Sequence, residues 1–212
     1  MQLQPVDCGW IEVICGSMFS GKTEELIRRL KRALIAQQHV QAFKPLIDDR
    51  YHAQAIASHA GRTLQALAVA DCDALAAAIR DETRVIGIDE VQFFSDDIVQ
   101  LCQTLALRGV RVIAAGLDQD YLGRPFGPMP ALMVDAEFVT KALAICVLCG
   151  NPAHRSHRNE NADSGKTIQV GTASEYVALC RRCHAVARAE ANAIAAQAQL
   201  DFADPADPSE HE

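Results

Sequence analysis

The chain has 212 residues, which is enough for one ordinary domain or for one domain with a small appended module, and too few for two large domains. Half of the residues are hydrophobic and 22% are charged, a composition that excludes disorder along the whole chain. The net charge is −7, but the last twelve residues hold five acids and no base, so the other 200 carry only −2. Because this body offers no broad basic surface, we expect no nucleic-acid partner.

The sequence also argues against a secreted protein held together by disulfides. It contains eight cysteines, but neither a signal peptide nor an apolar run of about 18 residues. We therefore expect a cytoplasmic protein without a membrane partner. In reducing surroundings cysteines serve as buried apolar residues, metal ligands or nucleophiles, so their spacing has to decide among these roles.

Apolar strands alternate with helices along the first two thirds of the chain. We expect strands at residues 10–15, 40–45, 84–90 and 111–118. Helices are expected from Thr23, over residues 73–80, and from a Ser95 cap to Gly109. Because neighbouring parallel strands need a crossover, which is usually helical, this order predicts an α/β fold over residues 1–143: a parallel sheet with helices on both faces.

The pattern changes beyond Lys141. A pair of cysteines is followed by about thirty polar residues and a second pair, with no hydrophobic run that could form a core. We expect residues 144–184, called the cysteine module below, to be a separate small domain. An alanine-rich helix and a disordered acidic tail are expected over residues 185–212.

A phosphate-binding loop joins the first strand to the first helix. Its sequence fits G-x-x-x-x-G-K-[ST] and lies in the strand–loop–helix context that this motif requires. Glycines let the backbone N–H groups turn toward a phosphate, the lysine reaches the β- and γ-phosphates, and the threonine hydroxyl is a Mg²⁺ ligand. The predicted ATP-binding residues of the loop are Gly16, Ser17, Met18, Phe19, Ser20, Gly21, Lys22 and Thr23.

Two acids close the third predicted strand, at the end that faces the ligand in open parallel sheets. Asp89 is placed to hold Mg²⁺ together with Thr23. Glu90 points to the other side of the strand and can act as a general base for an incoming hydroxyl or water. The alternative is that both are ordinary acids at a strand end.

The cysteine module carries a metal-ligand pattern. Cys146 and Cys149 are separated by two residues, as are Cys180 and Cys183, and thirty residues lie between the pairs. This spacing is typical of a structural four-thiolate zinc site. Free thiols, or His184 in place of Cys183, are the alternatives.

Taken together, these motifs resemble the thymidine kinases found in many bacteria and in animal cytosol. The resemblance runs in order from about residue 9 to His184. It is carried by Met18-Phe19-Ser20, Asp89-Glu90-Val91-Gln92-Phe93-Phe94, Gly116-Leu117-Asp118, Arg124-Pro125-Phe126-Gly127 and the two cysteine pairs.

The resemblance implies transfer of the ATP γ-phosphate to the 5′-hydroxyl of thymidine or deoxyuridine in pyrimidine salvage. It also implies Mg²⁺, structural zinc, a homotetramer, inhibition by dTTP, and a cysteine module that acts as a lid. Glu90 falls on the family's proton acceptor, and the ATP site extends to Asp89, Val91, Gln92 and Arg50. The positions implied around the nucleoside are Met18, Phe93, Leu117, Tyr121, Phe126, Gln169, Val170, Gly171, Thr172, Ala173 and Tyr176.

The main alternative is a zinc-bearing, nucleic-acid-dependent ATPase in which Glu90 activates water. The short chain argues against it, as do the two arginines, Arg155 and Arg158, that stand between the cysteine pairs beside the acids Glu160 and Asp163. A regulatory P-loop switch protein is a third reading, but it has no need of a metal-closed loop.

Overall fold

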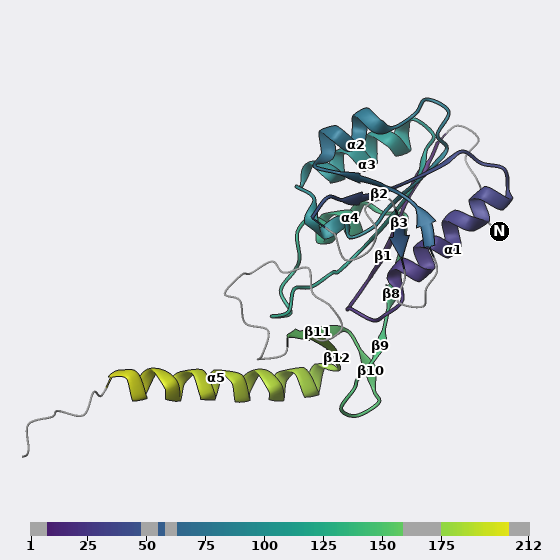
Figure 1. The fold of residues 1–212 in the computed structure, drawn as a ribbon. Coiled ribbons are helices and arrows are strands. Elements are labelled where there is room, and N and C mark those ends of the chain that lie inside the picture. The colour runs from purple at the N-terminus through teal and green to yellow at the C-terminus, as the bar shows by residue number, and fades with distance from the viewer. Residues whose placement is uncertain (1–7, 48–54, 58–62, 159–174, 204–212) are drawn as a thin grey trace, which may run out of the picture.

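A computed structural model describes residues 8–47, 55–57, 63–158 and 175–203. Its centre is a six-stranded parallel sheet in the order β5-β2-β6-β7-β1-β8 (Figure 1). The strands are β1 (Trp10–Gly16), β2 (Val40–Pro45), β5 (Leu67–Val69), β6 (Val85–Ile88), β7 (Arg111–Gly116) and β8 (Phe138–Ala142). β3 (Ala55–Ala57) and β4 (Thr63–Gln65) form a separate two-stranded antiparallel sheet.

Helices cover both faces of this sheet. Helix α1 (Lys22–Ile35) packs on one face, where Leu26, Ile27 and Leu30 join Ile14 and Ile113 in an apolar cluster. The other face carries α2 (Cys72–Ala78), α3 (Asp97–Leu107) and α4 (Met129–Asp135) over a larger cluster (Figure 1). The predicted α/β fold with helices on both faces is therefore confirmed.

Two strands of the sheet were not predicted, and both lie at its edges. β5 has only three residues, too few to show the hydrophobic periodicity of a strand. β8 exposes Phe138, Val139 and Lys141 and buries none of its residues fully, so its sequence lacks the continuous apolar run of a central parallel strand.

Several predicted boundaries shift in the structure. β6 ends at Ile88, so the expectation that Asp89 and Glu90 belong to the strand was wrong. Helix α3 begins at Asp97 after an Asp96 cap, not at Ser95, and Gly109 follows it in a left-handed conformation (φ 82°). The last helix, α5 (Arg181–Ala203), begins inside the second cysteine pair. No helix in the described part of the chain is both long and apolar enough to cross a membrane.

The cysteine module contains two short antiparallel strand pairs and the first turn of α5. β9 (Ala144–Ile145) pairs with β10 (Pro152–Ala153), and β11 (Arg155–Arg158) pairs with β12 (Tyr176–Leu179). The expectation that this part lacks a core was wrong, because small residues from separate strands collect around two of the cysteines. These buried residues are Ala144, Cys146, Ala153, Ala178, Leu179 and Cys180.

A buried carboxylate ties the sheet to α1. Glu12 on β1 is 6% exposed and accepts hydrogen bonds from Arg29 (2.6 Å), Arg111 (2.6 Å) and Trp10 (2.8 Å). Arg29 also donates to Thr140 on β8. Burial raises the pKa of Glu12, but the hydrogen bonds and charge of its partners outweigh burial and hold the pKa below its ordinary value.

We expect Glu12→Gln to lower the free energy of unfolding at pH 7 by about 3 kcal/mol, because it removes the carboxylate partner of Arg111 and leaves Arg29 with Glu25 alone. Since the folded-state pKa is lowered, this contribution is complete above the unfolded pKa of about 4.3 and disappears as pH falls through the folded value. Urea unfolding at pH 7 and at decreasing pH tests this, with the exposed Glu82→Gln as control. If the difference in free energy of unfolding between variant and parent did not decrease at acidic pH, the prediction would be wrong.

Candidate active site

The phosphate loop leaves β1 at Gly16 and enters α1 at Lys22. Gly16 has a φ of 145° and lies so close to β8 that a side chain there would collide with the carbonyl of Ala142. Gly21 (φ 84°) is the N-cap of α1, and Phe19 is also left-handed (φ 62°). These conformations fold the loop tightly over the positive end of the helix, as a phosphate site requires.

The loop lysine is buried within this turn. Lys22 is 8% exposed, and its Nζ donates to the main-chain carbonyl of Ser17 at 2.8 Å. Ser20 Oγ donates to the same carbonyl at 2.8 Å. A phosphate oxygen that binds in the loop can therefore replace the Ser17 carbonyl as the hydrogen-bond acceptor of the Lys22 ammonium group.

Thr23 and Asp89 meet beside the loop. Their side chains lie 3.4 Å apart (Oγ1 to Oδ1), and the Asp89 N–H donates to the carbonyl of Phe43 on β2. Asp89 is 5% exposed; burial and the neighbouring charge of Glu90 raise its pKa above the ordinary value. A hydroxyl beside a buried carboxylate fits Mg²⁺, a hard cation that takes oxygen ligands.

Glu90 is oriented by a turn rather than by the alternation of a strand. Its φ is 50°, a left-handed conformation that costs a non-glycine residue about 1–3 kcal/mol and that clusters at functional sites. Gln92 Nε2 donates to Glu90 Oε2 at 2.6 Å, and Gln92 Oε1 accepts the N–H of Leu117 at 3.0 Å. The buried Gln92 therefore fixes the carboxylate and joins it to the segment that follows β7.

The cysteine module reaches the phosphate loop directly. Ser156 Oγ on β11 accepts the Met18 N–H at 2.9 Å, and Ser17 Oγ lies 3.5 Å from the carbonyl of Ala153. Sequence reasoning missed Ser156, because nothing in a single serine indicates a partner 138 residues away. The contact places the module against the loop that is expected to hold ATP.

Aromatic positions implied for the nucleoside pair up in the structure. Phe93 and Phe126 meet edge to face with centroids 5.7 Å apart. The Arg158 guanidinium lies 5.4 Å from the Tyr121 ring, and Arg158 faces the buried Tyr176 across the β11–β12 pair. The remaining expected positions fall outside the described residues: Arg50, Gln169, Val170, Gly171, Thr172 and Ala173.

The two cysteine pairs converge as predicted. The four Sγ atoms of Cys146, Cys149, Cys180 and Cys183 all lie within 4.8 Å of one another. Cys149 Sγ is 3.6 Å from the Sγ atoms of both Cys180 and Cys183. Tetrahedral zinc with bonds of about 2.3 Å separates its sulfurs by about 3.8 Å, so the cluster fits this metal.

The His184 side chain contacts residues outside the cysteine cluster. Its Nε2 lies 3.1 Å from the carbonyl oxygen of Tyr121, and its ring meets that of His157 edge to face at 5.6 Å. These contacts favour four thiolates over the alternative in which His184 replaces Cys183.

A phosphate loop between β1 and α1, with a hydroxyl–carboxylate pair and a fixed glutamate at the carboxyl end of β6, defines a P-loop α/β protein that handles nucleotides. A family model described as thymidine kinase matches residues 9–184, which is most of the chain. The chain belongs to the thymidine kinase family. Membership implies a phosphotransferase reaction with ATP and thymidine as substrates.

Proposed function

We propose that this protein transfers the γ-phosphoryl group of ATP to the 5′-hydroxyl of thymidine, and of deoxyuridine, to give dTMP in pyrimidine salvage. The observation that carries the proposal is the Glu90 carboxylate, which Gln92 holds at 2.6 Å beside the phosphate loop and the Thr23–Asp89 pair. A base in that position serves an acceptor hydroxyl that must meet the γ-phosphate.

In this mechanism Lys22 and the loop N–H groups bind the β- and γ-phosphates, and Thr23 and Asp89 hold Mg²⁺. The metal supplies charge neutralisation when bound. Glu90 accepts the 5′-hydroxyl proton as the 5′-oxygen bonds to the γ-phosphorus. The bond to the β–γ bridging oxygen breaks, and ADP leaves. Positioning and charge neutralisation do most of the catalytic work.

We propose that the base lies among Met18, Leu117 and Tyr176, with Phe93, Tyr121 and Phe126 nearby and the main chain of residues 169–173 reading its edge. Two hydrogen bonds support this arrangement. The main-chain N–H of Met18 donates to Ser156 of the cysteine module, and the main-chain N–H of Leu117 donates to the Gln92 side chain. A pocket that forms only when these segments meet excludes water from the reaction.

Replacing Met18 or Leu117 by alanine is expected to lower the thymidine-to-deoxyuridine ratio of kcat/KM by several-fold, because one buried methyl is worth about 1 kcal/mol. Steady-state rates with both nucleosides measure the ratio. Val134→Ala, on the exposed side of α4, is the control. An unchanged ratio in both active variants would show that the thymine methyl lies elsewhere.

The cysteine cluster is proposed to hold one structural zinc per chain. We expect Cys146→Ser to lose the metal and to loosen β9 to β12 while the parallel sheet stays folded, because the cluster closes a module with a very small core. Metal analysis and hydrogen exchange measure the two effects. Cys8→Ser, outside the cluster, should keep the zinc. Freshly purified, reduced protein without zinc would contradict the proposal.

The family also supports proposals about assembly and regulation. We propose a cytoplasmic homotetramer that dTTP inhibits. Residues 1–143 would form the nucleotide-binding domain, residues 144–184 the zinc-bound lid, and residues 185–212 a helix and tail.

ADP production with different acceptors tests the proposed function. Thymidine and deoxyuridine should each stimulate ADP release from MgATP, whereas single-stranded DNA should not. Stimulation by DNA alone would instead support the nucleic-acid-dependent ATPase.

A further inference from the structure

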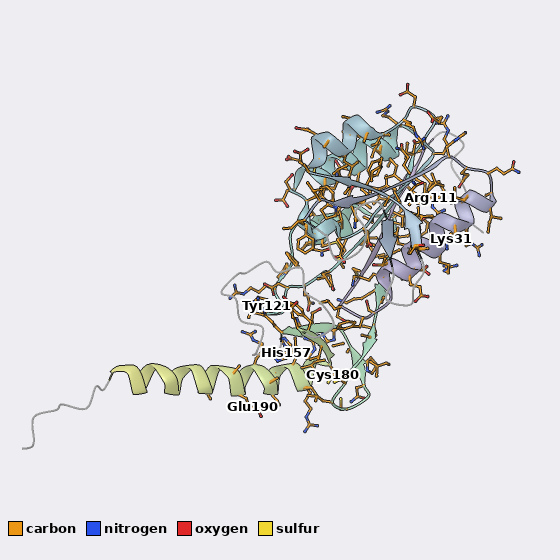
Figure 2. All side chains as sticks on the ribbon, in the orientation of Figure 1. Lys31, Arg111, Tyr121, His157, Cys180 and Glu190 are labelled. Carbon is orange, nitrogen blue, oxygen red and sulfur yellow. The ribbon has the colours of Figure 1, made fainter. Side chains whose placement is uncertain are left out.

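A basic cavity lies outside the phosphate loop. It has a volume of about 460 Å³ and lies between the Leu122–Gly123 turn, β11 and the first turns of α5. Three arginines and a histidine line it: Arg155, Arg181, Arg188 and His184. Figure 2 shows Tyr121 and His157, neighbours of this region, above the first turns of α5. Nothing in the proposed phosphoryl transfer uses this cavity.

The fold gathers these side chains from separate elements. On α5, Arg181, His184 and Arg188 follow one another at intervals of three and four residues and share one face of the helix. Arg155 comes from β11. Gly123 has a φ of 80°, a conformation that favours glycine, and a side chain there would displace the Arg155 guanidinium from its present position.

Hydrogen bonds hold two of the arginines in place. Arg155 Nη1 donates to the side chain of Gln119 and, at 3.0 Å, to the carbonyl of Gly123. Arg188 Nη1 donates to the carbonyl of Leu122 at 2.8 Å. Neutral acceptors fix these guanidinium groups without cancelling their charge. Arg181 has no hydrogen bond or ion pair with any residue that the structure describes.

Among the residues that the structure describes, no acidic side chain lines the cavity. The two nearby carboxylates that influence Arg155 and His184 have other partners: Asp118 forms an ion pair with Lys141 at 2.6 Å, and Asp120 Oδ1 accepts the N–H groups of Leu122 and Arg124. Burial, together with the charge of Arg181 and Arg188, lowers the pKa of Arg155. Like charges are thus held together at a free-energy cost that a bound anion would remove.

We propose that this cavity binds an anion with clustered phosphate or carboxylate oxygens. Guanidinium groups suit such ligands because their planar forks donate two parallel hydrogen bonds to one anionic group. A volume of about 460 Å³ suits a small molecule or a few side chains. The bound anion would join α5 to the turn that carries Tyr121, whose carbonyl already contacts His184.

Two sources can supply these oxygens. One is a small phosphorylated or polycarboxylate compound in solution. The other is this chain, whose last twelve residues carry five acids and no base. The fifteen residues from Ala189 to Ala203 span about 21 Å as a helix, and residues 204–212 can extend over about 30 Å, so the chain end lies within reach of the cavity.

Calorimetric titration with inorganic pyrophosphate tests the site. All proteins in this test carry Lys22→Ala, because this substitution weakens competing pyrophosphate binding at the phosphate loop. The comparison is between Arg181→Gln and Arg182→Gln, two exposed neighbours of which only Arg181 lines the cavity. Each is measured with the natural tail and with a full-length tail carrying Asp204→Asn, Asp207→Asn, Glu210→Gln and Glu212→Gln.

Arg181→Gln should weaken pyrophosphate binding about tenfold or more, whereas Arg182→Gln should leave it unchanged. Arg188→Gln should repeat the loss, and circular dichroism checks that each variant is folded. Tighter binding in the neutral-tail protein would identify the tail as the natural occupant, and equal binding would identify a free anion. Absence of binding with either tail, or equal losses at Arg181 and Arg182, would overturn the proposal.

Discussion

Glu90→Gln is expected to lower kcat for thymidine phosphorylation by about 10²–10⁴-fold and to leave the affinity for ATP nearly unchanged. An amide of the same shape cannot accept the 5′-hydroxyl proton, whereas the phosphates are held by Lys22 and the loop. Steady-state kinetics and equilibrium ATP binding separate the two effects.

Two controls sharpen this test. Glu82→Gln changes an exposed glutamate away from the site and should retain the parent rate. Gln92→Leu should lower kcat less than Glu90→Gln, because it leaves the carboxylate present but poorly oriented. If Glu90→Gln turned thymidine over at close to the parent rate, Asp89 or solvent would have to be the base.

Lys22→Ala is expected to weaken ATP binding and to lower kcat by about 10²–10³-fold, because a charged donor to the transferred phosphate is worth most in the transition state. Lys31→Ala provides the matched control: it removes a lysine from the same helix, on an exposed position (Figure 2). Loss of turnover with ATP affinity intact would show that Lys22 does not hold the phosphates in the ground state.

Short-range sequence patterns were sufficient to predict the central strands of the sheet and the helices between them. Buried central strands such as β1 and β7 are mostly apolar, and their alternation with helices along the chain was sufficient to predict a parallel sheet. The edge strands were not predicted, because β5 has only three residues and β8 is partly exposed. The small core around Cys146 and Cys180 escaped because its alanines come from strands far apart in the sequence.

The candidate site likewise has parts that the sequence indicates and parts that only the structure shows. The phosphate loop and the cysteine pairs are continuous or regularly spaced motifs, so the sequence alone indicated them. The hydrogen bonds that orient these groups join distant segments: Gln92 meets Leu117, and Ser156 meets Met18. The left-handed turn at Glu90 was likewise unpredictable, because glutamate seldom adopts that conformation.

The most direct test of the account is to identify the product formed from thymidine and ATP labelled in the γ-phosphate. Zinc-loaded protein with MgATP should place the label on the 5′-oxygen of thymidine and form one dTMP for each ADP. Label recovered only as inorganic phosphate, at a rate that thymidine does not change, would contradict the assignment of this chain as a thymidine kinase.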